Sequence, residues 1–193
     1  MTQAYVDRAT IETFLTRLGA EFSRPGRLYL IGETTQVYEN WRERTPRLVF
    51  AAEVAPEDRK DFDEILRQLL AQMEIEAYEE APGDVIPLPA GHAARARSAG
   101  RFGALEVYHF DPYSVAFRLI ARGDEPDYHA ILAFLWHGWL TVAEMTALLA
   151  DLLPRFTDET IQQDPAEFRR KFKGLRQMWQ ARRRNDPAAA ART

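Results

Sequence analysis

Residues 28–34 of this 193-residue chain indicate its fold class, with the sequence Leu28-Tyr29-Leu30-Ile31-Gly32-Glu33-Thr34. Its four consecutive apolar residues predict a strand over residues 27–31, because a strand buried on both faces loses the usual polar alternation. Gly32 ends that strand, and the residues after it predict a helix over 34–41. A strand that leads directly into a helix is typical of α/β proteins.

Strands and helices continue to alternate on both sides of this stretch. The periodicity predicts an amphipathic helix over residues 8–22 and another over 57–73. Further strands are predicted over 47–54, 75–79 and 104–110. Residues 82–91 contain three prolines and two glycines and predict an ordered loop over the body. After this point the pattern is entirely helical, with helices expected over 112–121, 125–136, 141–152 and 164–184.

These elements predict an α/β (α+β) fold with a small mixed sheet of about four or five strands flanked by helices. We expect an α/β body over residues 1–111 and a C-terminal helical portion over 112–184 packed on that body. The last residues, 185–193, are rich in proline and alanine and predict a disordered tail.

The composition excludes several classes of site. The chain has no cysteine, so disulfides, thiolate zinc sites, iron–sulfur clusters and a cysteine nucleophile are impossible. It also lacks the Gly-x-Ser-x-Gly, Walker and Rossmann glycine motifs. The longest near-apolar run, over 130–140, is shorter than the ~20 residues of a membrane span. We therefore expect a soluble, cytoplasmic protein that does not enter a membrane.

The charge is unevenly distributed along the chain. The net charge is −4, yet residues 167–193 carry nine lysines and arginines against two acidic residues. The preceding part of the chain is therefore strongly acidic, which is not the pattern of a domain that binds nucleic acid as a whole. The basic segment alone could contact RNA, a protein partner or the acidic body.

Four segments together resemble a known family: residues 28–34, 44–50 (Arg-Thr-Pro-Arg-Leu-Val-Phe), 85–89 (Val-Ile-Pro-Leu-Pro) and 110–123 (Phe-Asp-Pro-Tyr-Ser-Val-Ala-Phe-Arg-Leu-Ile-Ala-Arg-Gly). They resemble a bacterial and archaeal family of uncharacterised, minimal nucleotidyltransferase-fold proteins related to AbiEii-type toxins. In that family a strand ends in Gly-Gly-(Ser/Thr) before a helix, and the next strand carries Asp-x-Asp. An Asp-Pro-Tyr…Lys-Ile-Ala-Arg-Gly helix and an Asp-containing helix follow. The resemblance covers residues 10–156, and its most specific segment is 110–123.

The chain departs from the family at the residues that would perform the chemistry. The remnant site would comprise Gly32, Glu33, Thr34, Arg47 and Val49. Glu33 replaces the second glycine, which would let backbone N–H groups approach a triphosphate. Arg47 and Val49 replace the two aspartates that would hold Mg²⁺. The resemblance therefore implies a catalytically inactive protein, a pseudoenzyme without cofactor, with a binding or regulatory role in a toxin–antitoxin or defence setting.

An active enzyme with relocated metal ligands is the first alternative. Glu53 lies on the predicted strand that carries Val49, and Glu106 and Asp111 lie on or just after the fourth predicted strand. Together these three could bind Mg²⁺. In the simpler interpretation Glu53 and Glu106 face solvent or pair with arginine, and Asp111 caps a helix. Glu33 could also pair with Arg47 across the former site.

A ligand-binding role is predicted for Arg118, Arg122 and Asp127. Arg118 and Arg122 are four residues apart on one helix face, and Arg118 replaces the family's lysine while keeping its charge. In the family such residues would face the nucleotide. They could bind an anion here, or pair with neighbouring acidic residues, Asp127 among them.

The second alternative is an RNA-binding or scaffold protein that uses the basic C-terminal helix, from Arg169 to Arg184. Its apolar stripe, which includes Phe172 and Trp179, is expected to be buried, and its cations are expected to form a solvated face or to bind RNA or a partner. The segment Trp136-His137-Gly138-Trp139 is expected to pack in the core or to form a binding patch. The four histidines have no metal-binding spacing, and neither the partner nor the oligomeric state follows from the sequence.

Overall fold

The computed structural model describes residues 5–157 and 163–185, which form two compact units. The first, the α/β unit, consists of residues 5–81 and 95–110. The second, the helical unit, consists of residues 82–94 and the described residues from 111 onward. Each unit is described by itself.

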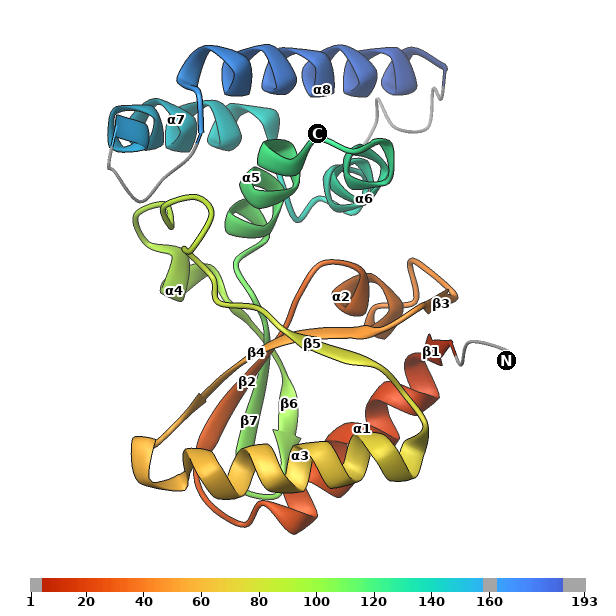
Figure 1. The fold of residues 1–193 in the computed structure, drawn as a ribbon. Helices are drawn as coiled ribbons and strands as arrows, with labels where there is room; N and C mark the ends of the chain where they lie inside the picture. The colour runs from red at the N-terminus through yellow and green to blue at the C-terminus, as the bar shows by residue number, and fades with distance from the viewer. Residues whose placement is uncertain (1–4, 158–162, 186–193) are drawn as a thin grey trace. The chain divides into compact units, whose positions relative to one another are not determined.

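A five-stranded mixed sheet forms the centre of the α/β unit, as the sequence predicts (Figure 1). The strand order is β5 (Ala77–Glu79), β4 (Leu48–Val54), β2 (Gly26–Leu30), β7 (Leu105–His109) and β6 (Arg97–Phe102). β2 is antiparallel to β4 and parallel to β7, so it lies between the two strands that contribute to the candidate site. A separate two-stranded sheet pairs β1 (Val6–Asp7) with β3 (Arg44–Thr45).

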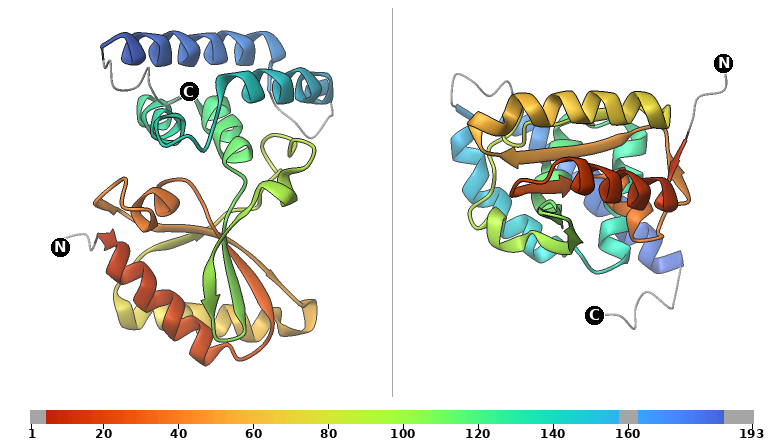
Figure 2. Two further views of the ribbon diagram at one scale, coloured as in Figure 1. Left: turned by 180° about the vertical axis from the view of Figure 1, so that it is seen from behind. Right: turned by 90° about the horizontal axis from the view of Figure 1, so that it is seen from below.

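Two amphipathic helices cover one face of the sheet. They are α1 (Arg8–Glu21) and α3 (Arg59–Met73), and they contact each other. Their apolar faces bury Phe14, Leu18 and Phe62 against Leu28 and Leu30 of β2. α1 also contacts β6, the strand seen beside it from behind (Figure 2). The opposite face of the sheet carries the alternate residues of the same strands, most of them polar or aromatic.

Short elements connect the sheet to these helices. α2 (Glu33–Tyr38) follows β2 and ends earlier than predicted, because Asn40 adopts a positive φ of 58°. A 3₁₀ turn (Pro56–Asp58) leads into α3. The edge strand β6 was not predicted from the sequence. It pairs antiparallel with β7 through an irregularity between Ser98 and Gly100.

The helical unit consists of α5 (Pro112–Arg122), α6 (Glu125–Trp136), α7 (Val142–Leu152), a 3₁₀ turn (Leu153–Thr157) and α8 (Pro165–Asn185). These helices begin and end within a residue or two of the predicted positions. Local signals explain α5 well: Asp111 caps its N-terminus, proline occupies its first turn, and Gly123 ends it at a φ of 78°. No helix in the described part of the chain is long and apolar enough to cross a membrane.

Residues 82–91, predicted as a loop over the body, belong to the helical unit, whose segment 82–94 also includes the start of α4 (His92–Arg95). Its Asp84 pairs with Arg118 of α5, and Leu88 O accepts a hydrogen bond from Arg155. α8 packs on α5, where Phe168 contacts Phe117 and Lys171 Nζ donates to Ala121 O. Of the predicted tail, Asn185 is the last residue of α8, and residues 186–193 lie outside the described residues.

Candidate functional site

The turn between β2 and α2 holds the first residues of the candidate site predicted from the sequence, Gly32, Glu33 and Thr34. Gly32 has a φ of 59° and a ψ of −119°, which favours glycine at this position. Glu33 then occupies the first helical position, and the backbone N–H of Thr34 donates to Ile31 O. The strand–glycine–helix arrangement predicted from the sequence is therefore present.

The carboxylate of Glu33 is held by side chains of the following segment. Its Oε1 accepts a hydrogen bond of 2.8 Å from Arg42 Nη1, and its Oε2 accepts one of 2.9 Å from the hydroxyl of Thr45. Arg42 is anchored in turn, because its Nε donates to Arg44 O. The predicted pairing of Glu33 with Arg47 is wrong: the cation on Glu33 is Arg42, five residues earlier. The side chain of Glu33 is 30% exposed, so the pair lies at the surface of the unit.

Thr34 connects the turn to the neighbouring strand. Its hydroxyl accepts a hydrogen bond of 2.7 Å from the backbone N–H of Val49, and its side chain is completely buried. Val49 O in turn accepts from the N–H of Ile31, so the turn and β4 are joined by two hydrogen bonds. Arg47 precedes β4 by one residue and is exposed. The side chains of Glu33 and Thr34 are therefore both engaged within the protein.

Arg47 and Val49, the positions at which the sequence resemblance places metal-binding aspartates, do not fit a metal ion. Mg²⁺ requires several oxygen ligands, and a two-metal site requires carboxylates between the ions. Arg47 contributes a positive charge, and the side chain of Val49 contributes no oxygen. Among residues 5–157 and 163–185, no three histidine or acidic side chains are grouped so as to bind a metal.

Glu53 and Glu106 lie on either side of an arginine on the open face of the sheet. In the strand register Arg27 is opposite both of them. Its Nη1 lies 3.7 Å from Glu53 Oε2, and its Nε lies 3.5 Å from Glu106 Oε2. A cavity of about 370 Å³ adjoins the three side chains. The interpretation that the two glutamates pair with an arginine is confirmed. Because Arg27 lies between them, it offsets the negative charge that would otherwise attract a metal ion.

Two stacked tyrosines continue this charged cluster. Tyr29 donates a hydrogen bond of 3.0 Å to Glu53 Oε2, and Tyr108 donates one of 3.2 Å to Glu106 Oε2. Their ring centroids are 5.8 Å apart. Burial, and then Glu53, raise the pKa of Tyr29 above its ordinary value, so its hydroxyl remains a donor at neutral pH.

Asp111 is a helix cap and the first residue of the helical unit. Its carboxylate is fully buried and accepts hydrogen bonds from the N–H groups of Tyr113 and Ser114 and, at 2.7 Å, from the hydroxyl of Ser114. These bonds satisfy the N–H groups that the start of a helix leaves unpaired. The capping role expected for Asp111 is confirmed.

Arg118, Arg122 and Asp127 all lie in the helical unit, where acidic side chains hold both arginines. Arg118 pairs with Asp84, a partner that the sequence did not suggest. Arg122 contacts Asp127 through two nitrogens, one of them Nε at 2.7 Å from Oδ2. Asp127 is 4% exposed and also accepts from the N–H of Asp124 at the start of α6. The structure therefore brings Arg122 and Asp127 together, while Arg118 contacts a different carboxylate.

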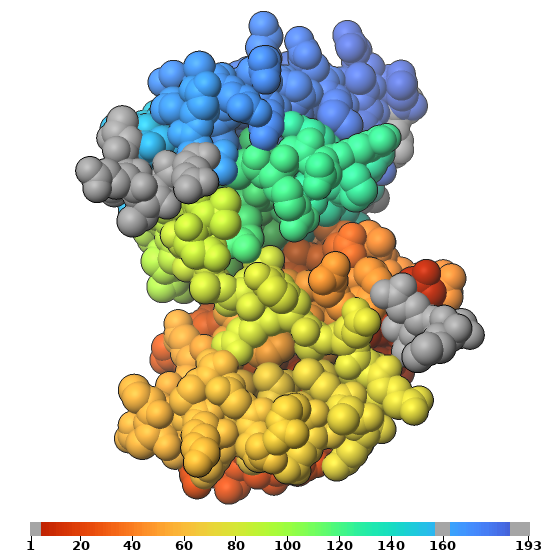
Figure 3. Space-filling view, in the orientation of Figure 1, coloured from red at the N-terminus to blue at the C-terminus, as the bar shows by residue number. Residues whose placement is uncertain are grey.

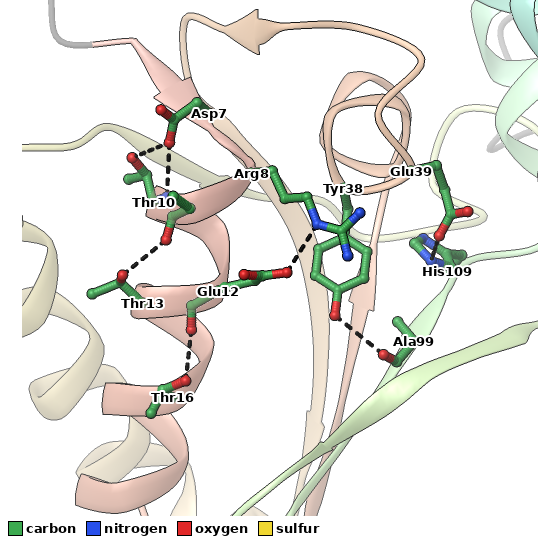
Figure 4. A network of polar contacts seen from close by, with 11 residues as sticks. Asp7, Arg8, Thr10, Glu12, Thr13, Thr16, Tyr38, Glu39, Ala99 and His109 are labelled. Atoms are coloured by element: carbon green, nitrogen blue, oxygen red, sulfur yellow. Dashed lines mark hydrogen bonds and ion pairs between the residues drawn. The ribbon is translucent and has the colours of Figure 1, made fainter.

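His109 is the buried polar residue at the end of β7 (Figure 4). Its Nδ1 lies 3.3 Å from the hydroxyl of Thr35, and its Nε2 lies 2.9 Å from Glu39 Oε1, out of line for a good hydrogen bond. The ring of Tyr38 covers it at 5.5 Å. Burial, with a smaller effect of Arg97, lowers the pKa of His109 to about 4, so the imidazole is neutral at physiological pH.

Comparisons with protein-family models, with curated proteins and with solved structures found no match to this chain.

Two arginines that contact the candidate glutamates, Arg27 and Arg42, were not predicted from the sequence. In β2, Arg27 and Tyr29 lie on the face opposite the buried Leu28 and Leu30, and this period of two could have placed Arg27 on the open face. Arg42 has no comparable signal, because its contact with Glu33 depends on how the segment after α2 turns back.

Proposed function

We propose that this chain is a nucleotidyltransferase-like protein without transferase activity that serves as a binding or regulatory protein. The observation that carries the proposal is the carboxylate of Glu33, held by Arg42 and Thr45. It lies in the turn where the family has a glycine that leaves room for a triphosphate. The side chain of Glu33 and the Arg42 paired with it stand where a bare glycine would leave the backbone open to phosphate.

The order of the elements supports the family. β2, Gly32 and α2 follow one another, β4 lies beside β2, and β7 lies on its other side. β7 is followed by the Asp111-Pro112 start of α5, and Asp127 lies in the next helix, α6. This is the succession of strand, turn, helix and aspartate-bearing helix that the resemblance implies.

The chemistry of β4 supports inactivity. Nucleotidyl transfer through two metal ions depends on carboxylates that neutralise the phosphates and hold the ions. Arg47 is exposed where one carboxylate would lie, and Val49 contributes only its backbone groups, whose N–H is bonded to Thr34. A regulatory role beside a toxin or defence protein would preserve the fold without these side chains.

The experiment that tests the proposal is a calorimetric titration of the full chain with ATP, CTP, GTP and UTP in the presence of Mg²⁺ or Mn²⁺. We expect no saturable heat at millimolar nucleotide, because Glu33 and Arg47 leave neither a phosphate cradle nor a metal site. Saturable binding at micromolar nucleotide would overturn the proposal and favour an active enzyme with relocated ligands.

A restoration variant separates missing ligands from altered geometry. The triple variant Glu33→Gly, Arg47→Asp and Val49→Asp rebuilds the family's residues, and its control carries Glu33→Gly, Arg47→Asn and Val49→Asn. Without metal, repulsion between the new carboxylates should lower the Tm of the aspartate variant below that of the control. Mn²⁺ should raise its Tm again, because a metal that binds the folded state stabilises it. If the parent responds to Mn²⁺ as strongly as the aspartate variant does, the metal site has been assigned to the wrong residues.

A further inference from the structure

The helical unit contains a cavity of about 680 Å³ that is independent of the nucleotidyltransferase-like turn. Its walls are the end of α6, the turn that follows, the start of α7 and the C-terminal part of α8. Leu135 and Leu140 are buried in its lining. The volume lies in the range of about 300–1,000 Å³ that is usual for sites of small organic groups, which includes a nucleobase.

Two tryptophans give this cavity an aromatic wall. Trp136 of α6 and Trp179 of α8 are both half-buried, and their ring centroids lie 6.3 Å apart with the planes at 88°. The guanidinium of Arg182 lies over the ring of Trp136, 5.3 Å from its centroid, and Arg183 also lines the cavity. Trp179 was expected to be buried in the core, as Phe172 is, yet part of its surface remains accessible. Accessible indole rings next to arginines are a platform on which planar bases stack.

A basic helix face leads to this cavity. Six arginines and lysines of α8 are exposed to solvent: Arg169, Arg170, Lys173, Arg176, Arg182 and Arg184. The acidic residue of α8 is Glu167 in its first turn, where it contacts Lys171 and Arg170. From Phe168 to Asn185 the helix contains no aspartate or glutamate. Side chains of α8 project from the surface of this unit in Figure 3.

The spacing of these cations suits an extended polyanion. A helix rises about 1.5 Å per residue, so residues 169–184 extend over roughly 22 Å, the length of several nucleotides of an extended strand. The opposite side of α8 buries Phe168, Phe172 and Leu175 within the same unit, which fixes the direction of the basic face. The cations are thus presented on a rigid element that ends beside the tryptophans.

We propose that the helical unit binds single-stranded nucleic acid, with the phosphates along α8 and an unpaired base stacked against Trp136 and Trp179. Cationic grooves combined with aromatic platforms are how proteins bind single strands without sequence preference. A duplex would meet only the basic face, because its bases are already stacked on one another. The proposal does not depend on whether the remnant site in the α/β unit binds a nucleotide.

The test measures the fluorescence anisotropy of labelled RNA and DNA oligonucleotides of the same mixed sequence, each single-stranded and as a duplex, with the full chain. We expect saturable binding of at least one single strand, and weaker binding of both duplexes. Whichever single strand binds more tightly identifies the nucleic acid. Bases stacked on the cavity wall should also quench the tryptophan fluorescence.

Two sets of variants separate the binding of phosphates from stacking. Lys173→Gln with Arg176→Gln should weaken binding about tenfold and reduce the slope of log K against log salt by about 0.7 for each phosphate that the variant no longer neutralises. Trp179→Leu should weaken binding about tenfold or more at an unchanged salt slope. The control, Lys60→Gln with Arg67→Gln, removes the same charge from exposed positions of α3 and should leave affinity unchanged.

Three results would overturn the proposal. The first is the absence of saturable binding to either single strand at low salt, and tight binding to vesicles of anionic lipid would then assign the basic face to membranes. The second is equal affinity for single strands and duplexes. The third is a loss of affinity in the α3 control as large as that in the α8 double variant. The α8 double variant changes only exposed side chains, so its result does not depend on how well Trp179→Leu folds.

Discussion

Acidification should destabilise the α/β unit through a single buried side chain, His109. The imidazole is 2% exposed, and its surroundings hold it neutral with a pKa of about 4, against 6.5 in an unfolded chain. In the pH window between these two values the unfolded chain binds a proton that the folded chain does not. The free energy of unfolding must therefore fall as the pH falls through this window.

The size of the effect follows from the two pKa values. Between about pH 7.5 and about pH 5, His109 should remove about 2 kcal/mol of stability, and the loss should approach about 3 kcal/mol below the folded pKa. Burial is the largest cause of the lowered pKa, and the carboxylate of Glu39 near Nε2 is 33% exposed, so solvent screens its charge. A loss of this size is a large fraction of the stability of an ordinary domain.

The assay is urea unfolding of the parent and of His109→Gln at both pH values, followed by circular dichroism. Glutamine stays neutral, so the variant should lose about 2 kcal/mol less than the parent on acidification, whatever its stability at neutral pH. The control is His129→Gln, which changes an exposed histidine of α6 and should retain the parent's pH dependence. If His109→Gln loses as much stability as the parent, His109 is not the group responsible.

Two further predictions concern stability. Gly19→Ala should lower the free energy of unfolding by several kcal/mol, because the new Cβ would lie 2.1 Å from the backbone oxygen of Phe102. This clash outweighs the gain of about 1 kcal/mol that alanine brings to a helix. Gly174→Ala should instead raise the free energy of unfolding by about 1 kcal/mol, because a Cβ at Gly174 of α8 meets no other atom. Thermal melts test both variants, and a Tm that shifts in the same direction for Gly19→Ala and Gly174→Ala would contradict this prediction. Asp111→Ala should cost about 1–2 kcal/mol in urea unfolding because α5 loses its cap, and an unchanged midpoint would contradict that role.

The agreement between sequence and structure is closest where the signals are local. In α5, the capping Asp111, the proline after it and Gly123 act within a few residues of the helix ends, so its limits could be predicted. The apolar run of β4 and the single apolar stripe of α3 likewise depend only on neighbours in the chain. These patterns predicted the α/β class and the turn at Gly32.

β6 shows why some elements could not be predicted. It is an edge strand, Arg97–Phe102, that pairs with β7 alone and has no fully buried residue. An edge strand needs no continuous apolar pattern, and Gly100 bends this one at a φ of 139°. Its formation depends on β7, which offers a partner only once the sheet has assembled.

The residue types at the candidate site follow from the sequence alone: a glycine turn, Glu33 directly after it, and Arg47 and Val49 around the start of the next strand. Tertiary structure decided what those residues contact. Arg42 reaches Glu33 because the chain turns back after α2, and Arg27 separates Glu53 from Glu106 because β2 pairs with β4 on one side and β7 on the other. Such contacts join residues that are distant in the chain through strand register and loop direction, which are set by the packing of the whole unit and not by any local pattern.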